Sequence, residues 1–340
     1  MYMDVLKNQT LATHTTMRLG GNAQYMVAAH TEDELLEIIQ YAQHNQLRIM
    51  VLGSGSNIVF GDNGFDGLVI LNEIADMNID ATTGYASAKS GTNWDDFVHE
   101  CVANNLAGIE ALSLIPGTVG ASPVNNIGAY GQEVKDTITK VRALDTVSLT
   151  FVELSNEECQ FTYRNSIFKS SEYGRYIISE VFFKLTIANE NYTAPRYASL
   201  QTALNSQGIT QPTVQNVRDV VINIRQAKLP DPSVLPNTGS FFKNPIVSQE
   251  KRDALLLQYP SMPYFAHTQG VKLAAGWLID SAGLKGYAQD GMRVYDKQAL
   301  VLVNDGTRSF QSLLNIKNHI QNTVYEKFGV MLEPEPEIIA

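Results

Sequence analysis

The sequence is poor in the residues that build metal and disulfide sites. Only 2 of its 340 residues are cysteines, Cys101 and Cys159, and they form no CxxC pair. Two isolated thiols cannot make a metal cluster on their own. The 6 histidines form no HxxxH or HExxH pattern, so no metal site is expected. We expect both thiols to pack as small buried side chains in a reducing compartment.

Long apolar runs and an excess of positive charge are also missing. No uncharged apolar stretch reaches the roughly 18 residues of a membrane span, and the first residues lack the apolar core of a signal peptide. The net charge of −10 opposes non-specific binding to nucleic acid. The sequence therefore predicts a cytoplasmic protein, expected to be a monomer, with neither a membrane nor a nucleic acid as partner.

The composition that remains is that of an ordinary globular protein. Hydrophobic residues make up 44% and charged residues 18% of the chain, and this length favours two or three domains. Alternating patterns predict strands and helices throughout. The clearest helices are expected at 93–105, 218–227, 272–282 and 309–328. Lys228 and the Pro-rich residues after it should end the third of these, and we place a domain boundary there.

A glycine-rich turn, Gly53-Ser54-Gly55-Ser56-Asn57, follows an apolar strand at 48–52. Glycines allow a close backbone approach, and successive amide groups with small hydroxyls can hold a phosphate. The turn matches neither GxGxxG nor a P-loop, because Ile58 follows and no GKS or GKT is present. By itself it is equally consistent with a structural turn.

A second candidate cradle lies at 115–123, and it runs directly into NNIGAYG at 125–131. Residues 106–132 are too rich in glycine for regular structure, yet too apolar for disorder. Long ordered loops in compact domains are usually functional. Although one structural loop is the simpler interpretation, two phosphate-type loops in one chain favour a diphosphate, and hence a dinucleotide.

Three polar groups stand in unusual surroundings. Arg164 and Lys169 lie among aromatic residues, where an arginine can fork onto a carboxylate. Ser240 stands between Gly239 and two phenylalanines, and no GxSxG elbow marks it as a hydrolase nucleophile. Three alternating glutamates near the C-terminus would share one face of an extended strand. Taken singly, an exposed arginine, a turn serine and a solvated acidic tail are the simpler interpretations.

Seven segments in this order resemble the UDP-N-acetylenolpyruvoylglucosamine reductase family, and the extra stretch at 191–204 resembles its longer, type I subgroup. The resemblance covers nearly the whole chain. Any one segment is weak evidence, whereas all seven in order are specific. They are GSGSN (53–57), IPGTVGASPVNNIGAYG (115–131), YRNSIFK (163–169), AKLPDP (227–232), GSFFKNP (239–245), VKLAAGWLID (271–280) and LEPE (332–335).

The resemblance implies an α+β fold. A two-part FAD-binding region of the vanillyl-alcohol-oxidase-like (PCMH) type would comprise residues 1–70 and 71–226. An α/β substrate-binding domain would comprise 227–329, and the tail at 330–340 would return to the active site. The two glycine-rich loops would hold FAD non-covalently, since neither contains a histidine or cysteine for a covalent tether. The cofactor-binding residues would be Gly53, Ser54, Gly55, Ser56, Asn57, Pro116, Gly117, Thr118, Gly120, Ala121, Ser122, Asn125, Gly128 and Tyr130.

The resemblance also implies the reaction. NADPH would reduce the flavin, and flavin N5 would then deliver hydride to the enolpyruvyl group of UDP-N-acetylglucosamine enolpyruvate, giving UDP-N-acetylmuramate for peptidoglycan. Arg164 and Glu335 would sit at the substrate carboxylate, where charge develops. Ser240 would protonate the neighbouring carbon. Substrate binding would use Tyr197, Lys228 and Asn244 at the diphosphate, with Gln298 and Tyr163 in the same pocket.

The sequence departs from the family pattern at Asn125, Pro336, Glu337 and Ala340. The tail also leaves a choice between Glu333, Glu335 and Glu337 for the catalytic glutamate, although alignment of LEPE selects Glu335. Another flavin oxidase on the same scaffold, or a non-catalytic nucleotide sensor, is the alternative. A sensor would not need Ser240, Arg164 and the acidic tail together.

Overall fold

The computed structural model describes residues 4–307 and 309–340 and divides into two compact units. Unit 1 contains the residues up to Gln9 together with 23–54 and 66–227. Unit 2 contains 10–22, 55–65 and the chain from Lys228 to the C-terminus. Each unit is therefore assembled from segments that are distant in sequence.

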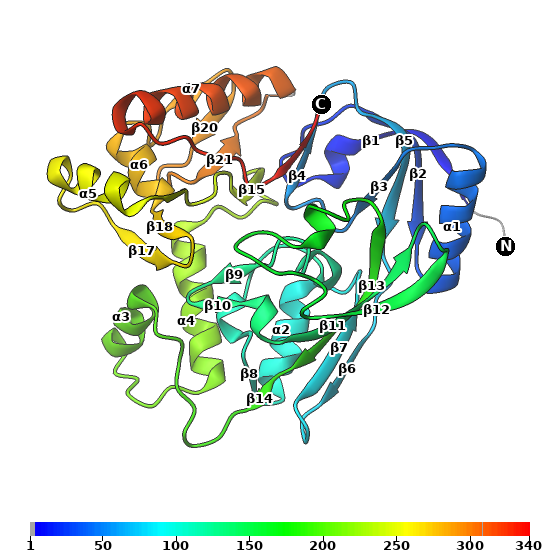
Figure 1. Ribbon diagram of the computed structural model, residues 1–340, viewed down its shortest axis with the longest axis horizontal. Coiled ribbons are helices and arrows are strands. Elements are labelled where there is room, and N and C mark those ends of the chain that lie inside the picture. The colour runs from blue at the N-terminus through cyan, green and yellow to red at the C-terminus, as the bar shows by residue number, and fades with distance from the viewer. Residues whose placement is uncertain (1–3, 308) are drawn as a thin grey trace. The chain divides into compact units, whose positions relative to one another are not determined.

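A four-stranded sheet with one covering helix forms the first part of unit 1 (Figure 1). Its strand order is β1-β2-β5-β3, and β3 pairs parallel to β5. Helix α1 begins where the Thr31 hydroxyl accepts a hydrogen bond from the Glu34 amide, a cap that threonine commonly provides. The elements are β1 (Leu6–Thr10), β2 (Asn22–Ala29), α1 (Glu32–His44), β3 (Ile49–Leu52) and β5 (Phe65–Asn72).

The second part of unit 1 is an antiparallel sheet of order β12-β11-β13-β7-β6. Helix α2 packs its aromatic face into the same core, where the Phe97 and Phe183 rings lie 4.9 Å apart. The elements are β6 (Met77–Asp80), β7 (Tyr85–Lys89), α2 (Trp94–Ala103), β11 (Ile138–Asp145), β12 (Thr150–Ser155) and β13 (Tyr176–Lys184). Cys101 and Cys159 are both buried here as free thiols, which confirms the packing expected for them.

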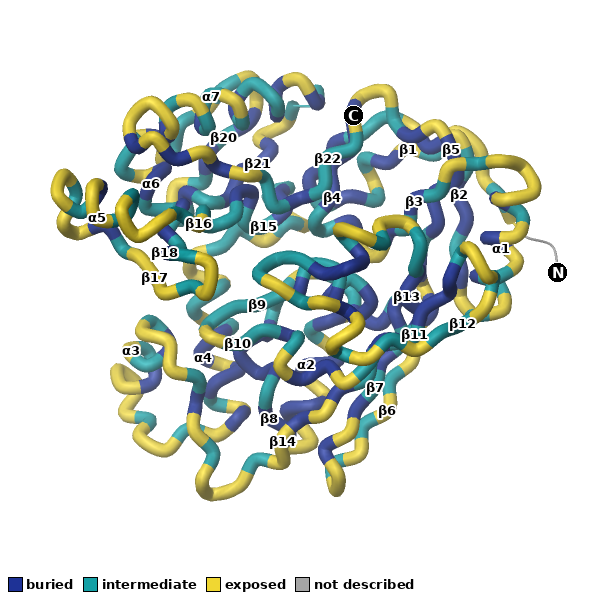
Figure 2. The backbone as a smooth tube through the Cα atoms, in the orientation of Figure 1, coloured by how far each residue is buried: buried dark blue, intermediate teal, exposed yellow. Residues whose placement is uncertain are grey.

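The stretch predicted to resist regular structure contains only short elements. Between α2 and β11 the chain makes two-residue strands and single 3-10 turns, yet most of its side chains are buried or half-buried (Figure 2). The strands are β8 (Leu106–Ala107), β9 (Gly128–Ala129) and β10 (Gln132–Glu133), and β14 (Thr186–Ile187) pairs with β8. The turns are η2 (Glu110–Leu112), η3 (Val119–Ala121) and η4 (Val134–Asp136). The expectation of an ordered, buried loop system is confirmed.

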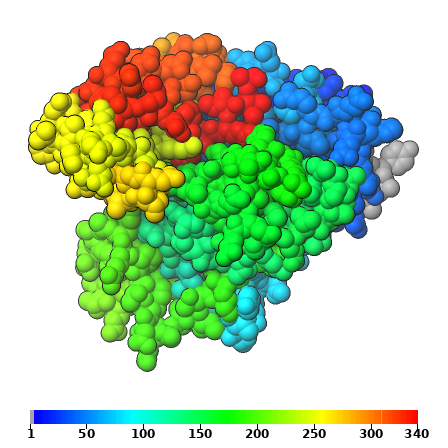
Figure 3. Space-filling view, viewed as in Figure 1, coloured from blue at the N-terminus to red at the C-terminus, as the bar shows by residue number. Residues whose placement is uncertain are grey.

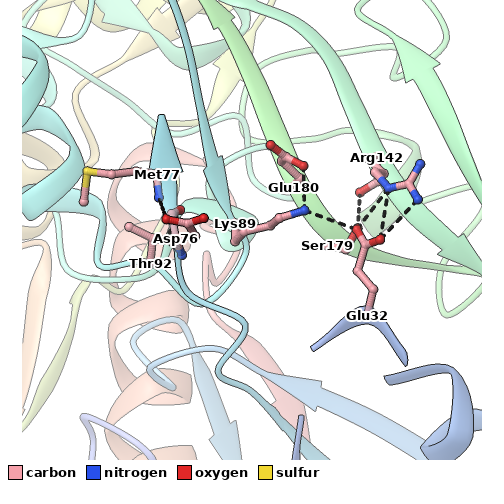
Figure 4. A network of polar contacts seen from close by, with 8 residues as sticks. All are labelled: Glu32, Asp76, Met77, Lys89, Thr92, Arg142, Ser179 and Glu180. Carbon is pink, nitrogen blue, oxygen red and sulfur yellow. Dashed lines mark hydrogen bonds and ion pairs between the residues drawn. The ribbon is translucent and has the colours of Figure 1, made fainter. Parts of the chain in front are cut away.

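Two polar networks tie the parts of unit 1 together. Glu32, at the start of α1, receives a forked pair from Arg142 on β11 and a hydrogen bond from the Ser179 hydroxyl on β13 (Figure 4). Lys89 on β7 bridges Glu32 at 3.5 Å and Glu180 at 2.7 Å. These contacts link the four-stranded part to the five-stranded sheet. The second network lies near α2, where Arg218 forms an ion pair with Asp95 at a nitrogen–oxygen distance of 2.7 Å.

Helices α3 (Ala198–Ser206) and α4 (Val214–Lys228), apart from the last residue of α4, complete unit 1. They pack through a small core that joins Leu200 and Leu204 to Val217 and Val221. Helix α4 begins four residues before the predicted Arg218, because two apolar positions ahead of it are already buried. Val214 packs in the core of the five-stranded sheet and Val217 in this small core. It ends one residue before Leu229-Pro230, at the break that the prolines impose.

The described residues of unit 2 form two small antiparallel sheets, three α-helices and one parallel strand pair. The sheet orders are β15-β21-β20-β19 and β16-β18-β17. Strand β22 (Glu337–Ile339) pairs parallel to β4 (Ile58–Phe60), and the two labels lie side by side in Figure 2. The remaining strands are β15 (Asn237–Ser240), β16 (Ile246–Val247), β17 (Tyr264–His267), β18 (Gly270–Leu273), β19 (Ala288–Gln289), β20 (Met292–Val294) and β21 (Val301–Asn304). The helices are α5 (Gln249–Gln258), α6 (Ala275–Ser281) and α7 (Phe310–Phe328).

The helix predicted at 272–282 is wrong in its first turn. Lys272 and Leu273 belong to β18 and pair with Phe265 and Tyr264, so the tertiary hairpin overrides the helical pattern. Helix α6 begins only at Ala275. Helix α5 and strand β17 lie at the surface (Figure 3), where the side chains of Leu257 and Tyr264 are exposed. Among the described residues, no helix combines the length and apolarity needed to cross a bilayer.

Candidate functional site

The two predicted cradles approach each other closely within unit 1. Gly53 begins the turn after β3, and a methyl group built on it would lie 2.6 Å from the Thr118 hydroxyl oxygen. That distance is too short for any side chain, so the contact requires glycine. The sequence predicted both residues as cofactor-binding, and the structure brings them together.

From Gly55 onward, the first turn belongs to unit 2. Gly55 has a φ of 63°, and a methyl group there would lie 2.0 Å from the His14 carbonyl oxygen. The Gly55 carbonyl accepts a hydrogen bond from the Thr16 amide at 3.1 Å. The Asn57 carbonyl accepts from the Glu337 amide at 3.0 Å, which joins this turn to the C-terminal tail.

Backbone hydrogen bonds hold the second cradle against the start of α2. The Gly120 amide donates to the Ser90 carbonyl at 2.9 Å, and the Trp94 amide donates to the Gly117 carbonyl at 3.1 Å. A methyl group on Gly120 would lie 2.5 Å from Ser90 Cβ. The buried Ser122 hydroxyl bonds to the Val119 carbonyl at 2.7 Å. The loop also contains Pro116 and Ala121. All residues at 116–122 that were predicted to bind the cofactor therefore lie on one closely packed stretch of backbone.

Arg164 and Lys169 both contact the second half of this loop. An Arg164 amino group donates to the Gly128 carbonyl at 2.8 Å, and its guanidinium lies 5.3 Å from the Tyr163 ring centre. Lys169 donates to the Asn125 side-chain oxygen at 2.6 Å. The structure therefore gathers these predicted residues around 125–128, and the simpler interpretation of Arg164 as a merely exposed arginine is wrong.

Tyr130 is in contact with one predicted residue and with one that the sequence reasoning missed. Its ring meets the Tyr197 ring edge to face at 5.5 Å. The Arg225 guanidinium hydrogen-bonds to the Tyr130 hydroxyl, while Arg225 Nε has no partner among the described residues. Burial lowers the pKa of Arg225. The sequence did offer a signal for Arg225. It lies seven residues after Arg218 in the same predicted helix, and positions i and i+7 share a helix face.

The Ser240 region of unit 2 lies beside the C-terminal tail. Ser240 is the last residue of β15, and it follows Gly239, whose φ is 71°. The next residue, Phe241, is fully buried and accepts a hydrogen bond through its carbonyl from the Glu335 amide at 2.8 Å. A methyl group on Gly239 would meet nothing within 4 Å, so there is open space beside Ser240.

The other predicted substrate residues occupy separate positions. Asn244 caps α6, because its side-chain oxygen accepts from the Ala275 amide at 2.9 Å. The Gln298 side-chain oxygen accepts from the Leu300 amide at 3.3 Å and would lie 3.0 Å from a methyl group on Gly276. Lys228 is the exposed last residue of α4. The roles of these residues stay predictions.

The residues of unit 1 suit a nucleotide cofactor. Glycine positions that tolerate no side chain expose backbone at the Gly53–Thr118 contact and at Gly120, and such backbone can approach a diphosphate. Arg225 is a half-buried arginine next to the same loop, and its buried Nε–H has no partner among the described residues. Bound FAD would thus be held mainly by backbone amides and small hydroxyls. No group of three or more possible metal ligands occurs in the described part of the chain.

Two family models match this chain. The model "FAD binding domain" matches residues 23–150, and the model "UDP-N-acetylenolpyruvoylglucosamine reductase, C-terminal domain" matches residues 231–339. The predicted combination of an FAD-binding region with a distinct C-terminal domain is therefore confirmed. The predicted domain boundaries themselves stay a prediction.

Full-length relatives and a solved structure agree with these models. The UDP-N-acetylenolpyruvoylglucosamine reductase of Ralstonia nicotianae is 44% identical, with 97% of each chain covered. That of Aliivibrio fischeri is 40% identical over 98% of this chain and 94% of the relative. The crystal structure of the Thermus caldophilus reductase matches the fold over 100% of both chains, with a TM-score of 0.68 at 22% identity. The chain is an FAD-dependent oxidoreductase and belongs to the UDP-N-acetylenolpyruvoylglucosamine reductase family.

Proposed function

We propose that this protein uses NADPH and FAD to reduce the enolpyruvyl group of UDP-N-acetylglucosamine enolpyruvate, giving UDP-N-acetylmuramate. The observation that carries the proposal is the pairing of Glu335 with Phe241 directly after Ser240, within a full-length match to this reductase family. When bound, FAD supplies the hydride chemistry. The protein's own residues must bind the substrate and deal with charge and protons.

Arg164 would stabilise the negative charge that develops on the substrate carboxylate. Its hydrogen bond to the Gly128 carbonyl and its position over the Tyr163 ring restrict the orientation of the guanidinium. A cation held in place before the reaction stabilises charge without reorganising, and one such donor is worth about 10²–10³ in rate. Glu335 would act at the same carboxylate as a hydrogen-bonding partner.

Ser240 would give the proton to the carbon next to the one that receives hydride. A serine is a weak acid, so this step needs a carbanion-like acceptor. Two features support the assignment. The open space at Gly239 leaves room for a substrate, and the buried Phe241 anchors the strand end that carries the hydroxyl.

Tyr197, Lys228 and Asn244 would bind the substrate diphosphate, with Gln298 and Tyr163 in the same pocket. Lys228 brings positive charge to a strongly acidic chain of net charge −10. Asn244 uses its side-chain oxygen for the α6 cap, so its amide nitrogen is the donor available to a phosphate. Tyr197 is 37% exposed, enough for a phenol to reach a ligand.

The test is NADPH oxidation by flavin-loaded protein with and without the enolpyruvyl sugar nucleotide. We expect oxidation to depend on that substrate, with stoichiometric formation of the lactyl product measured by mass spectrometry. Equal rates in its absence would show only a generic diaphorase and would contradict the proposal. Protein that binds no FAD after reconstitution would contradict it as well.

A further inference from the structure

Glu110 is a buried carboxylate that gathers donors from separate parts of unit 1. Its side chain is only 1% exposed. One carboxylate oxygen accepts hydrogen bonds from the Tyr192 hydroxyl at 2.7 Å and from the Gln132 amide nitrogen at 2.9 Å. The other accepts from the Gly108 amide at 2.5 Å. These donors satisfy a charge that would otherwise be costly to bury.

The donors of Glu110 connect two loops. Gln132 comes directly after the glycine-rich loop at 115–131, and its own oxygen accepts from the Ala111 amide at 2.8 Å. Tyr192 lies in the segment that leads into α3, and its ring packs against the small core that contains Ala194 and Leu200. Glu110 therefore joins the base of the cofactor loop to the start of the segment that carries Tyr197.

The far end of the same segment touches the same loop. Tyr197 meets the Tyr130 ring edge to face at 5.5 Å. A methyl group on Gly131 would lie 3.8 Å from Tyr197 Cβ and 3.9 Å from Pro195 Cβ, which is ordinary van der Waals contact. Residues 192–197 are thus attached to the cofactor loop at both ends, by a charge-assisted hydrogen bond at Tyr192 and by ring packing at Tyr197.

The two attachments differ in strength. A hydrogen bond to a charged group is stronger than an edge-to-face pair of rings. Burial, together with the nearby Glu110 charge, raises the pKa of Tyr192, so the hydroxyl keeps its proton and remains a donor over the working pH range. The Tyr192 contact is therefore the stronger of the two.

We infer that Tyr192 is a positioning residue, which through Glu110 holds the 192–197 segment on the glycine-rich loop and so sets Tyr197 for the substrate diphosphate. The inference rests on the proposed role of Tyr197. Tyr192 itself needs no contact with the substrate. Its effect is to restrict the conformations of Tyr197 before the substrate arrives, which lowers the entropy lost on binding.

The test compares Tyr192→Phe with the native holoenzyme, and Tyr325→Phe serves as the matched control because Tyr325 is 53% exposed. Removal of the Tyr192 hydroxyl should raise KM for the enolpyruvyl sugar nucleotide about 10-fold or more, from the loss of one charge-assisted hydrogen bond. The value of kcat should change less than about threefold, and FAD content should stay native. Hydrogen–deuterium exchange should accelerate in residues 193–204. The control should match the native protein in each measurement.

Two results would overturn the inference. One is unchanged exchange in 193–204, which would show that the hydroxyl does not hold the segment. The other is faster exchange with an unchanged KM, which would show a purely structural contact. Tyr197→Ala separates this inference from the proposed function. If that variant keeps a native KM, the substrate role of Tyr197 fails, and the substrate part of the inference fails with it.

Discussion

The Glu335 amide donates a hydrogen bond to the carbonyl of Phe241 at 2.8 Å, which places Glu335 beside the residue that follows Ser240. The pairing continues on the next residues, since the Lys243 amide donates to the Glu333 carbonyl at 2.9 Å and Phe242 forms a bridge with Pro334. The tail is therefore held in one register. Glu333 is 75% exposed, and it pairs with Lys243 at 3.6 Å.

This register predicts which glutamate matters. Glu335→Gln should lower kcat by about 10²-fold or more, the usual cost of losing one group that stabilises the transition state. Glu333→Gln should change kcat less than twofold, because an exposed ion pair contributes little. Steady-state kinetics of Glu335→Gln, Glu333→Gln and Glu337→Gln would measure the difference. A large loss in Glu333→Gln with a native Glu335→Gln would show that the register is wrong.

Ser240→Ala should separate the two half-reactions. Removal of the hydroxyl leaves the buried Phe241 and the β15 pairing in place, so folding and FAD binding should persist. Stopped-flow absorbance should show near-native reduction of the flavin by NADPH, while reoxidation by the enolpyruvyl sugar nucleotide slows by at least about 10²-fold. Loss of both half-reactions would contradict the assignment of Ser240 as proton donor.

Gly120→Ala should impair the cofactor site. Its new methyl group would lie 2.5 Å from Ser90 Cβ and 2.9 Å from Ser90 Cα, so the loop must move. Overpacking of this kind typically costs about 1–3 kcal/mol of unfolding free energy. We expect a lower Tm and a lower FAD content, measured by absorbance after purification.

Gly208→Ala is the control for that substitution. Gly208 has a φ of 73°, but a methyl group there meets nothing within 4 Å. The Gly208→Ala variant should lose only about 1 kcal/mol of unfolding free energy, from backbone strain. Its FAD content should stay native. Equal loss of flavin in both variants would show that the loop contact is not the cause.

The Glu32 network should make stability depend on acid pH. Burial alone would raise the pKa of Glu32, but hydrogen bonds from Arg142 and Ser179 together with the Lys89 charge lower it below its ordinary value. A carboxyl with a depressed folded pKa stabilises the fold above its unfolded pKa of about 4.3 and loses that contribution as the pH falls through the folded value. Glu32→Gln should therefore destabilise the protein at pH 7 by about 1–3 kcal/mol.

That difference should shrink as the pH falls below about 4, which urea titrations at several pH values would measure. Asp280→Asn is the control, because Asp280 is 50% exposed in its pair with Lys285, and its Tm should stay near native. If the loss of unfolding free energy in Glu32→Gln stayed constant down to pH 3, the stabilisation could not come from the charge of Glu32.

Local signals in the sequence were sufficient for most individual elements. Thr31 and Asn93 mark the starts of α1 and α2, since a short polar side chain there can accept from the first free amides. The glycines at 53 and 120 marked the cradles because only glycine allows such contacts. The helix prediction failed at Lys272 and Leu273, where pairing with β17 decided the conformation.

The amino-acid sequence by itself determined the family, the two glycine-rich loops and the types of residue that the chemistry requires, because these depend on local backbone needs and on side-chain chemistry. Only the tertiary structure decided that Glu335 pairs beside Ser240, that Arg225 reaches Tyr130, and that Glu110 joins Tyr192 to Gln132. Such contacts join residues far apart in the chain. These contacts depend on burial and on the pairing of distant strands, and no local sequence pattern encodes burial or pairing.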